Sequence, residues 1–300
     1  MPTATLQSDL TAIPKSTVGR VSLLDVSPCG ELFQAAKDGD TNIIKQLIQQ
    51  GANVNQQCKK LNGYTPLIVA AVAGKVSAVE TLLNLGADPN IRDDDGYKIS
   101  RLAIDADQMD AVKCLIKHGV VVTDPRVKEG KAWLTEQYEI MCKGVKDPES
   151  KPPRAVLDYL NNGYPKGPWP KKRSILDVYW EHILLQYIGD QPLDIERNVS
   201  TDLILPHSGT FERILSGHAG YKEAARLLYK VLPTTKYIIK GTYVDKKDRW
   251  VTERWGYFDA EHNLQVEDGI DTFLINEETE KIDVMMINFN VTSINPCING

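Results

Sequence analysis

Asp271 is the residue whose surroundings in the sequence most favour chemistry. Two runs of β-branched and aromatic residues, 269–275 and 281–291, flank a short polar break, which predicts a β-hairpin. Alternation along the first strand places Asp271 on the same face as Phe273. An ionised carboxylate among hydrophobic side chains is costly, so we expect a raised pKa or a charged partner. The alternative is that Asp271 caps a bulge or faces water, and the pattern leaves both open.

A preceding strand brings a second carboxyl group toward Asp271. Antiparallel pairing of 250–258 with the hairpin places four residues on the Asp271 face: Val251, Glu253, Trp255 and Tyr257. A register shifted by one residue would place Trp250, Thr252 and Arg254 there instead. We prefer the first set because it is more apolar. Two carboxyl groups in an apolar cup share a proton or raise one pKa, an arrangement that general acid–base catalysis uses.

The elements that must position these carboxyls form the second half of the chain. Four strands are expected at 236–244, 250–258, 264–275 and 282–291, with a short strand at 202–206 and helices at 174–188 and 217–229. A curved antiparallel sheet wrapped round helices leaves a conical cavity, the usual ligand site. The candidate walls are Tyr179, Trp255, Tyr257, Phe273, Met285, Ile287 and Phe289. His182 lies on the apolar face of the first helix, either as a catalytic group or as a core histidine.

Several motifs of this half occur in a known order. They are Gly189-Asp190 after a helix, Leu205-Pro206 after a strand, Gly217-His218-Ala219-Gly220 opening a helix, Leu232-Pro233 ending it, Glu253-Arg254-Trp255 and the Asp271-x-Phe273 hairpin. The order resembles the SnoaL-like branch of the nuclear transport factor 2 superfamily over 175–291. The resemblance implies a cone-shaped α+β fold. That fold hosts cyclases, isomerases, dehydratases and binding modules, so it does not decide the function.

Ketosteroid isomerase, a member of this fold, gives one comparison for the candidate residues. Asp271 aligns with the hydrogen-bond-donating aspartate of that enzyme, and His182 stands at its catalytic tyrosine. Its general base corresponds to Leu205, which cannot take a proton. The isomerase mechanism therefore does not transfer, although His182, His207 or Glu253 could supply a base in another reaction.

The first half of the chain is repetitive. Similar segments that begin with Gly-Ala or Gly-Val start at residues 51, 86 and 119, and Gly63-Tyr64-Thr65-Pro66-Leu67 precedes the second. These residues resemble the ankyrin repeat, with units at about 30–61, 62–94 and 96–124. The resemblance implies a helical stack that binds a protein partner, with exposed fingers at 56–62 and 92–97. The candidate partner-binding residues are Asn62, Tyr64, Arg92, Asp94 and Tyr97.

The expected domain organisation follows from these halves. Residues 1–27 form a mobile tail, 28–163 the ankyrin repeats with a degenerate helical cap, 164–173 a Pro-rich linker and 174–300 the SnoaL-like domain. The fold class is α followed by α+β: an N-terminal ankyrin solenoid, then a cone-shaped curved antiparallel sheet wrapped round helices. Val284 and Met286 would lie on the outer face of the sheet, a candidate homodimer surface.

Composition restricts the partners and the compartment. The 300 residues are 42% hydrophobic and 25% charged, with a net charge of −5, which argues against a nucleic-acid surface. No apolar run is long enough to span a membrane, so a cytoplasmic protein is expected. The cysteines, 5 in number and scattered, suggest reduced thiols. His207, His218 and His262 lack metal-ligand spacing and no nucleotide motif occurs, so we expect neither a metal nor a cofactor.

Two functions remain open from the sequence. In the first, the chain is an adaptor whose repeats recruit a protein and whose cone binds a small apolar ligand or mediates dimerisation. In the second, it is a cofactor-independent cyclase, isomerase or dehydratase with Asp271 as acid or base and His182, Tyr179 or Glu253 orienting the substrate. We favour the adaptor because the general base of the related isomerase is missing. Such a fusion suits a translocated bacterial effector and an ordinary cytosolic protein equally.

Overall fold

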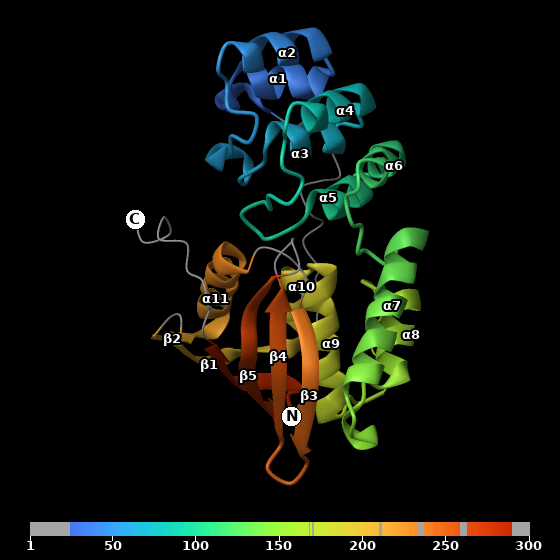
Figure 1. Ribbon diagram of the computed structural model, residues 1–300, viewed down its shortest axis with the longest axis vertical. Coiled ribbons are helices and arrows are strands. Elements are labelled where there is room, and N and C mark those ends of the chain that lie inside the picture. The colour runs from blue at the N-terminus through green and yellow to red at the C-terminus, as the bar shows by residue number, and fades with distance from the viewer. Residues whose placement is uncertain are drawn as a thin grey trace, which may run out of the picture. The chain divides into compact units, whose positions relative to one another are not determined.

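The computed structural model describes residues 25–167, 169, 171–209, 212–232, 237–258 and 263–289. The chain divides into two compact units, Met1–Val121 and Val122–Gly300 (Figure 1). Most of the expected N-terminal tail, together with His262 and Cys297, lies outside the described residues.

The first unit is a stack of three helix pairs. The pairs are α1 (Glu31–Asp38) with α2 (Thr41–Gln49), α3 (Pro66–Val72) with α4 (Val76–Asn84), and α5 (Ile99–Asp105) with α6 (Met109–Lys117). The first helices of successive pairs pack against each other, and so do the second helices. Thr65 caps α3 by accepting from the backbone N–H of Ile68 at 3.2 Å, and Pro66 opens the helix, as its sequence predicts.

The two long fingers of this unit are fastened to each other. Asn62 donates from its side chain to Asp95 at 2.9 Å and to Asp93 at 3.3 Å. Asp93 is buried and also accepts from the backbone N–H groups of Asp95 and Tyr97, at 3.1 and 2.7 Å. The acidic run therefore holds the shape of the finger, and is more than a solvated loop.

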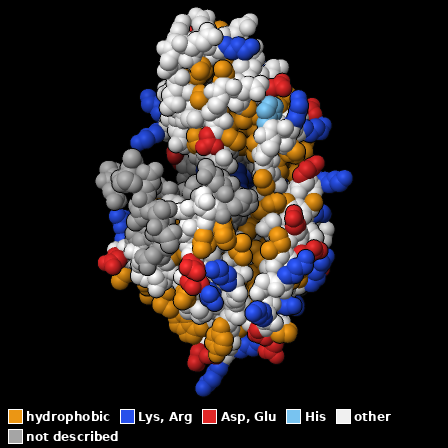
Figure 2. All heavy atoms as spheres, viewed as in Figure 1, with side chains coloured by type: hydrophobic (Ala, Val, Ile, Leu, Met, Phe, Trp, Pro, Cys, Tyr) orange, Lys and Arg blue, Asp and Glu red, His pale blue; other side chains and the backbone are white. Residues whose placement is uncertain are grey.

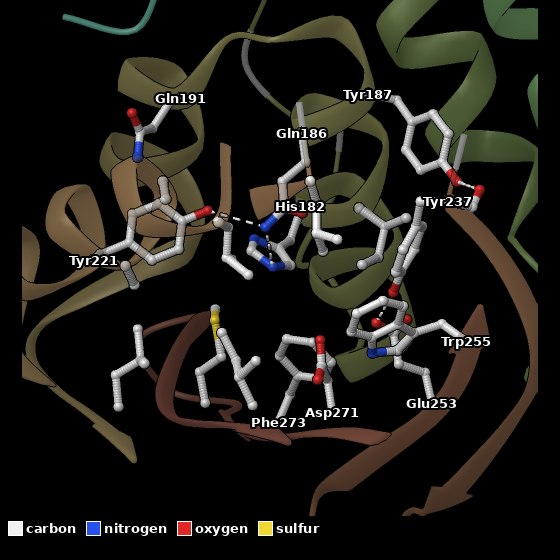
Figure 3. A pocket seen from close by; sticks show the side chains of 18 of the residues that line it. His182, Gln186, Tyr187, Gln191, Tyr221, Tyr237, Glu253, Trp255, Asp271 and Phe273 are labelled. Carbon is white, nitrogen blue, oxygen red and sulfur yellow. Dashed lines mark hydrogen bonds between the residues drawn. The ribbon is translucent and has the colours of Figure 1, made fainter. Parts of the chain in front are cut away.

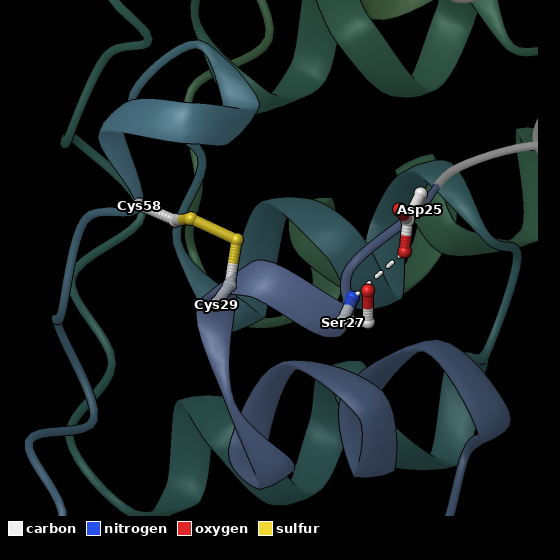
Figure 4. The surroundings of a disulfide bond; sticks show 4 residues. All are labelled: Asp25, Ser27, Cys29 and Cys58. Carbon is white, nitrogen blue, oxygen red and sulfur yellow. Dashed lines mark hydrogen bonds between the residues drawn. A yellow bond between two sulfur atoms is a disulfide. The ribbon is translucent and has the colours of Figure 1, made fainter.

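A disulfide joins Cys29 to Cys58 in the first unit, so the expectation of reduced thiols is wrong for this pair (Figure 4). Cys29 ends the short 3₁₀ helix Ser27–Cys29, and Cys58 precedes another at Lys59–Leu61. The Cα atoms lie 5.6 Å apart, within the range that a disulfide bridges. The spacing of 29 residues does not by itself predict a disulfide, because only the folding of the repeat brings the two cysteines together. Cys114 and Cys142 are free.

The second unit begins earlier than the sequence predicts. Its first helices are α7 (Lys128–Gly144) and α8 (Arg154–Asn162). The sequence predicts that they cap the repeats and that a linker starts at 164. Instead, both pack on α9 (Ile175–Ile188) and share its hydrophobic core, which places the division after Val121. An amphipathic helix pattern shows which face of α7 and α8 is buried but not which element buries it. The sequence pattern therefore could not show that these helices pack on α9.

The sheet of the second unit has six strands in the order β2-β1-β6-β5-β4-β3. The strands are β1 (Val199–Gly209), β2 (Arg213–Ser216), β3 (Tyr237–Asp245), β4 (Trp250–Phe258), β5 (Leu264–Asn276) and β6 (Lys281–Phe289). β1 and β6 pair in parallel, and every other pair is antiparallel, so the sheet is mixed rather than wholly antiparallel. The pattern of the short β2 strand was not recognised in the sequence.

The register of β4 and β5 is the preferred one. Glu253 lies opposite Asp271, and Asp271 in turn lies opposite Ile287 on β6. The alternating residues of β4 from Val251 to Tyr257 are buried, and Thr252 pairs with Thr272 on the other face. Both carboxyl groups therefore point to the helix-covered side of the sheet.

α9 runs through the centre of the second unit. Ser174 and Asp177 form the reciprocal capping box at its start, and Gly189 ends it with φ of 83°. After it come the short helix α10 (Gln191–Asn198) and, beyond β2, α11 (Gly217–Val231). None of the helices described is both long and apolar enough to cross a membrane.

The expected linker is part of this unit as well. Arg173 is buried and donates to Glu181 and Asn198, each at 2.5 Å, and to Glu280 at 3.0 Å. It thereby connects α9, α10 and the β5–β6 turn. Its partner Glu181 is fully buried and also accepts from Arg197 at 2.6 Å, so the carboxylate is compensated by two guanidinium groups.

Candidate functional site

A cavity of about 140 Å³ lies between the helices and the sheet of the second unit (Figure 3). A cavity can hold one water once its volume exceeds roughly 10–15 Å³, so this one has room for several waters or for one small organic molecule. Its apolar lining comes from α9, α11 and the sheet: Ile183, Leu205, Ala224, Ala225, Leu228, Leu232, Tyr257, Phe273, Met285 and Ile287. Its polar lining comprises His182, Gln186, Tyr187, Gln191, Tyr221, Tyr237, Glu253, Trp255 and Asp271.

Glu253 is held between two tyrosines. It is 1% exposed, and the hydroxyls of Tyr179 and Tyr237 donate to its two carboxylate oxygens. Burial raises the pKa of Glu253, and the two tyrosine hydrogen bonds partly offset the rise. The same burial, together with the Glu253 carboxylate, raises the pKa of both tyrosines. Both oxygens of Glu253 are therefore already occupied.

Asp271 is the contrasting carboxyl group. It is 9% exposed, and its Oδ1 is buried without a hydrogen-bond partner. Burial raises its pKa well above the usual value, and the neighbouring Glu253 raises it further. The indole N–H of Trp255 partly offsets the rise, although Nε1 of Trp255 makes no hydrogen bond of ordinary geometry. The raised pKa favours the protonated form of Asp271, in which the carboxyl group can donate a hydrogen bond.

His182 is oriented by a buried carboxylate. Its Nδ1 lies 2.9 Å from Asp194, and neither side chain is exposed. Asp194 also accepts from Tyr221 at 2.5 Å and from Asn198 at 2.9 Å. A proton on Nδ1 facing Asp194 leaves Nε2 as an acceptor, which suits the side-chain nitrogen of Gln186 3.0 Å away.

Gln191 contributes a further buried polar group. It is the first residue of α10 and is 8% exposed, and its side-chain Nε2 has no hydrogen-bond partner. Figure 3 shows it beside Tyr221, on the other side of the cavity from Asp271 and Trp255. Together with Nε1 of Trp255 and Oδ1 of Asp271, three buried polar atoms of the lining are left without a partner.

The structure brings most of the sequence candidates of the second unit to one cavity. The three catalytic candidates, Asp271, His182 and Glu253, all line it, as do Trp255, Tyr257, Phe273, Met285 and Ile287. Tyr179 stands behind Glu253, and Phe289 is buried against Trp255 at 5.3 Å between ring centroids, so neither is part of the lining. His207 packs edge-on against Phe289 instead of facing the cavity.

Sequence reasoning missed the polar groups contributed by the helices. Gln186 follows His182 by one helical turn, and this spacing could have placed it on the same face of α9. The sequence carries no comparable spacing for Asp194, Gln191 and Tyr221. α10 is too short to show a periodic pattern, and Tyr221 fits the amphipathic pattern of α11 without pointing to a site. Among the described residues, no group of three His, Cys, Asp or Glu side chains is arranged to hold a metal ion.

The candidates in the first unit are less uniformly placed. Asp94 is exposed and Tyr97 is half-buried beneath Arg101, whose guanidinium lies 5.3 Å from the ring centroid. Arg92 donates to the backbone carbonyl of Gly96 at 2.9 Å. Asn62 donates to the side chain of Asp95 on the neighbouring finger. Tyr64 is only 7% exposed, so its side chain is a poor candidate for contact with a partner.

Comparisons with known proteins concern the first unit. Residues 32–126 match the family model for ankyrin repeats, in three copies. Neurogenic locus notch homolog protein 2 of Homo sapiens is 34% identical over 110 residues, 37% of this chain but 4% of that protein. The 2-5A-dependent ribonuclease of Mus musculus is 42% identical over 65 residues, 22% of this chain and 9% of the ribonuclease.

A shorter relative is covered more fully. Protein phosphatase 1 regulatory subunit 27 of Mus musculus is 34% identical over 110 residues, which are 36% of this chain and 70% of that protein. The three helix pairs of the first unit occupy the matched region. The chain therefore belongs, through residues 32–126, to the family of ankyrin-repeat proteins.

Proposed function

We propose that this chain is an adaptor with two recognition parts. The ankyrin unit binds a protein partner, and the second unit binds a small, mainly apolar molecule in its cavity. We also infer a SnoaL-like fold for the second unit, on the order of its helices and strands and on the placement of Asp271.

One observation carries the ligand-binding part of the proposal. Three buried polar atoms around the cavity have no partner, although leaving such an atom unsatisfied costs about 1–3 kcal/mol. A fold that had only to be stable would place hydrophobic side chains there. Unpaired polar groups in the wall of an apolar cavity are typical of a binding site, where the ligand completes the hydrogen bonds.

A fluorescent probe tests this part. 1-Aminoanthracene is a neutral, mainly apolar aromatic probe, and its emission should rise when it binds to the full chain. Ala225→Phe should remove the signal, because a phenyl ring placed there fills the space. Lys222→Phe, on an exposed position of α11, is the matched control and should leave binding unchanged. A cavity-filled variant that binds the probe as well as the wild type contradicts ligand binding at this site.

The protein-binding part rests on the ankyrin family. One relative is named a regulatory subunit of a protein phosphatase, so a protein partner is the natural expectation for the shared repeats. The exposed Asp94 finger is the candidate contact. A photo-crosslinking amino acid at Asp94 should capture a defined partner, whereas the same group at Lys113, exposed on α6, should not. Equal capture from both positions would show that the finger has no special role.

The outer face of the sheet is the candidate dimer surface. Several large apolar side chains are exposed on it, among them Ile204, Ile270 and Met286, with exposed fractions of 51%, 46% and 38%. Figure 2 shows hydrophobic side chains gathered over the sheet of the second unit. Val284 lies beside Ile204 across the parallel β1–β6 pair. Met286→Lys should shift a dimer to monomer in light scattering of the full chain; a wild-type monomer excludes this surface as a homodimer contact.

A catalytic function is the second candidate, favoured by the pairing of His182 with Asp194 and by Asp271, whose raised pKa favours its protonated form. In a cofactor-independent isomerase, cyclase or dehydratase, Nε2 of His182 would exchange its hydrogen bond with Gln186 for a proton from carbon, while the Asp271 carboxyl group donates a proton to the substrate oxygen. NMR should then detect deuterium exchange at the carbon next to a ketone, and His182→Gln and Asp271→Asn should abolish it. If the ketone binds and no exchange occurs, the cavity is a binding site only.

A further inference from the structure

We propose that the cavity ligand is an uncharged, mainly apolar molecule with a hydrogen-bond-accepting oxygen at each of two opposite ends. This inference rests on the proposed ligand binding and goes beyond it by assigning the chemistry of the ligand. It follows from the three unpaired atoms, their donor character and their positions in the cavity.

Two of the three unpaired atoms are donors, and the third becomes one on protonation. Nε2 of Gln191 carries N–H groups and has no partner, and Nε1 of Trp255, whose N–H faces Asp271, makes no hydrogen bond of ordinary geometry. Asp271 becomes a donor when protonated, the state that burial and Glu253 both favour. A ligand that satisfies all three must therefore present acceptors, such as carbonyl, ether or hydroxyl oxygens.

The other polar side chains around the cavity already have partners. Gln186 donates to Tyr221 at 3.2 Å and lies 3.0 Å from His182. Tyr221 donates to Asp194, and the two oxygens of Glu253 accept from tyrosines. The hydrogen-bonding capacity that remains for a ligand is therefore concentrated at Gln191 and at the Asp271–Trp255 pair.

These two positions lie at opposite ends of the space. In Figure 3, Gln191 stands beside Tyr221 on the α10 and α11 side, whereas Asp271 and Trp255 lie together on the sheet. Most of the remaining lining is aliphatic or aromatic, including Ile183, Leu228 and Met285, and the central His182 and Gln186 are hydrogen-bonded to each other. One oxygen cannot serve both ends, so the ligand must carry two, separated by an apolar body.

The charge of the lining favours a neutral molecule. Among the described residues that line the cavity none is lysine or arginine, so an anion would find no positive partner among them and would face Glu253. A cationic ligand could pair with the carboxyls, but an ammonium group offers only donors and would leave the N–H groups of Gln191 and Trp255 unsatisfied.

Two matched ring compounds test the inference. Decalin-2,6-dione carries a carbonyl at each end of an apolar skeleton, and 2-decalone is the same skeleton with one. Both are measured by calorimetry on the full chain, or by displacement of 1-aminoanthracene. The dione should bind about two- to ten-fold more tightly, the value of one further net hydrogen bond.

Substitutions assign the two ends. Gln191→Met should reduce the dione-to-monoketone ratio to about one, because it removes the donor at that end. Asp271→Leu should lower the ratio, because only the indole N–H of Trp255 then remains at the other end. Asp271→Asn keeps a neutral donor and should keep the ratio. Thermal unfolding of each variant shows whether it is folded before its affinity is compared.

The outcomes separate this inference from the function on which it rests. If 1-aminoanthracene and both decalin compounds fail to bind the wild-type chain, ligand binding itself is wrong. If they bind but the dione has no advantage, or keeps its advantage in Gln191→Met, the two-ended ligand is wrong and ligand binding stands. The expected ratio, together with its loss in Gln191→Met and its decrease in Asp271→Leu, supports both.

Discussion

Two buried carboxyl groups stand opposite each other on neighbouring strands, yet they differ in state. Glu253 has a tyrosine hydroxyl on each oxygen, whereas Oδ1 of Asp271 has none. Burial raises the pKa of both, and the charge of Glu253 adds to the rise at Asp271. Asp271 is therefore the group that gains most from protonation, and the group that a ligand oxygen can satisfy.

The state of Asp271 predicts how stability depends on pH. A raised pKa means that the folded chain keeps a proton that the unfolded chain loses above about pH 4. The stabilisation from this bound proton is complete below the pKa that Asp271 has in the unfolded chain, and it is lost as the pH rises through the higher pKa that Asp271 has in the folded chain. The free energy of unfolding of the second unit should therefore fall with pH, by up to about 1.4 kcal/mol per pH unit for each such group. Urea unfolding between about pH 5 and 8 measures the slope.

The variant Asp271→Asn measures how much Asp271 contributes to the pH dependence of the unfolding free energy. The variant has no proton to lose at this position, so its pH profile should be flatter than that of the wild type, and its relative stability should increase toward pH 8. Glu278→Gln, exposed on the β5–β6 turn, is the control and should keep the wild-type slope. Parallel profiles for Asp271→Asn and wild type would show that Asp271 is ionised in the folded chain.

Among the elements, those with a regular pattern were predictable from the sequence. Alternation along β4 and β5 gave the register that sets Glu253 opposite Asp271, and Ser174 with Asp177 marked the start of α9. α10 is too short for its periodicity to stand out, so Gln191 was missed. The parallel pairing of β1 with β6 depends on contacts remote in sequence, which local pattern cannot supply.

Arg173 connects three of these elements, and its removal should be costly. Arg173→Met leaves the buried Glu181 with Arg197 alone and frees the backbone carbonyl of Glu280, which Arg173 contacts at 2.7 Å. Breaking a buried ion pair by removing one partner costs about 3–5 kcal/mol. Denaturant unfolding should show this loss, while Lys172→Met, one residue earlier and exposed, should change stability by less than about 0.5 kcal/mol. A loss at Arg173 no larger than at Lys172 would mean that water replaces its contacts.

At the scale of the whole molecule, the disulfide belongs to one unit only. It closes a loop between residues 29 and 58 in the ankyrin unit. For a loop of this length, the chain-entropy model gives a stabilisation of about 3–4 kcal/mol. Cys29→Ser together with Cys58→Ser should therefore lower the melting temperature of the first unit and leave that of the second unchanged in calorimetry. A shift of both transitions would show that the units unfold together.

The position of the boundary gives the last prediction. The hydrophobic core of the second unit includes side chains of α7 and α8, among them Leu134, Met141, Leu157 and Leu160. Burying one such side chain contributes about 1.5–3 kcal/mol, so losing these four removes about 6–12 kcal/mol, which is comparable to the whole stability of a domain, about 5–15 kcal/mol. A fragment of residues 122–300 should fold with a cooperative transition and bind 1-aminoanthracene. A fragment of 164–300, which starts where the proline-rich segment suggests a linker, should not fold. Cooperative folding of the shorter fragment would restore the boundary that the sequence suggests, and would assign α7 and α8 to the repeats.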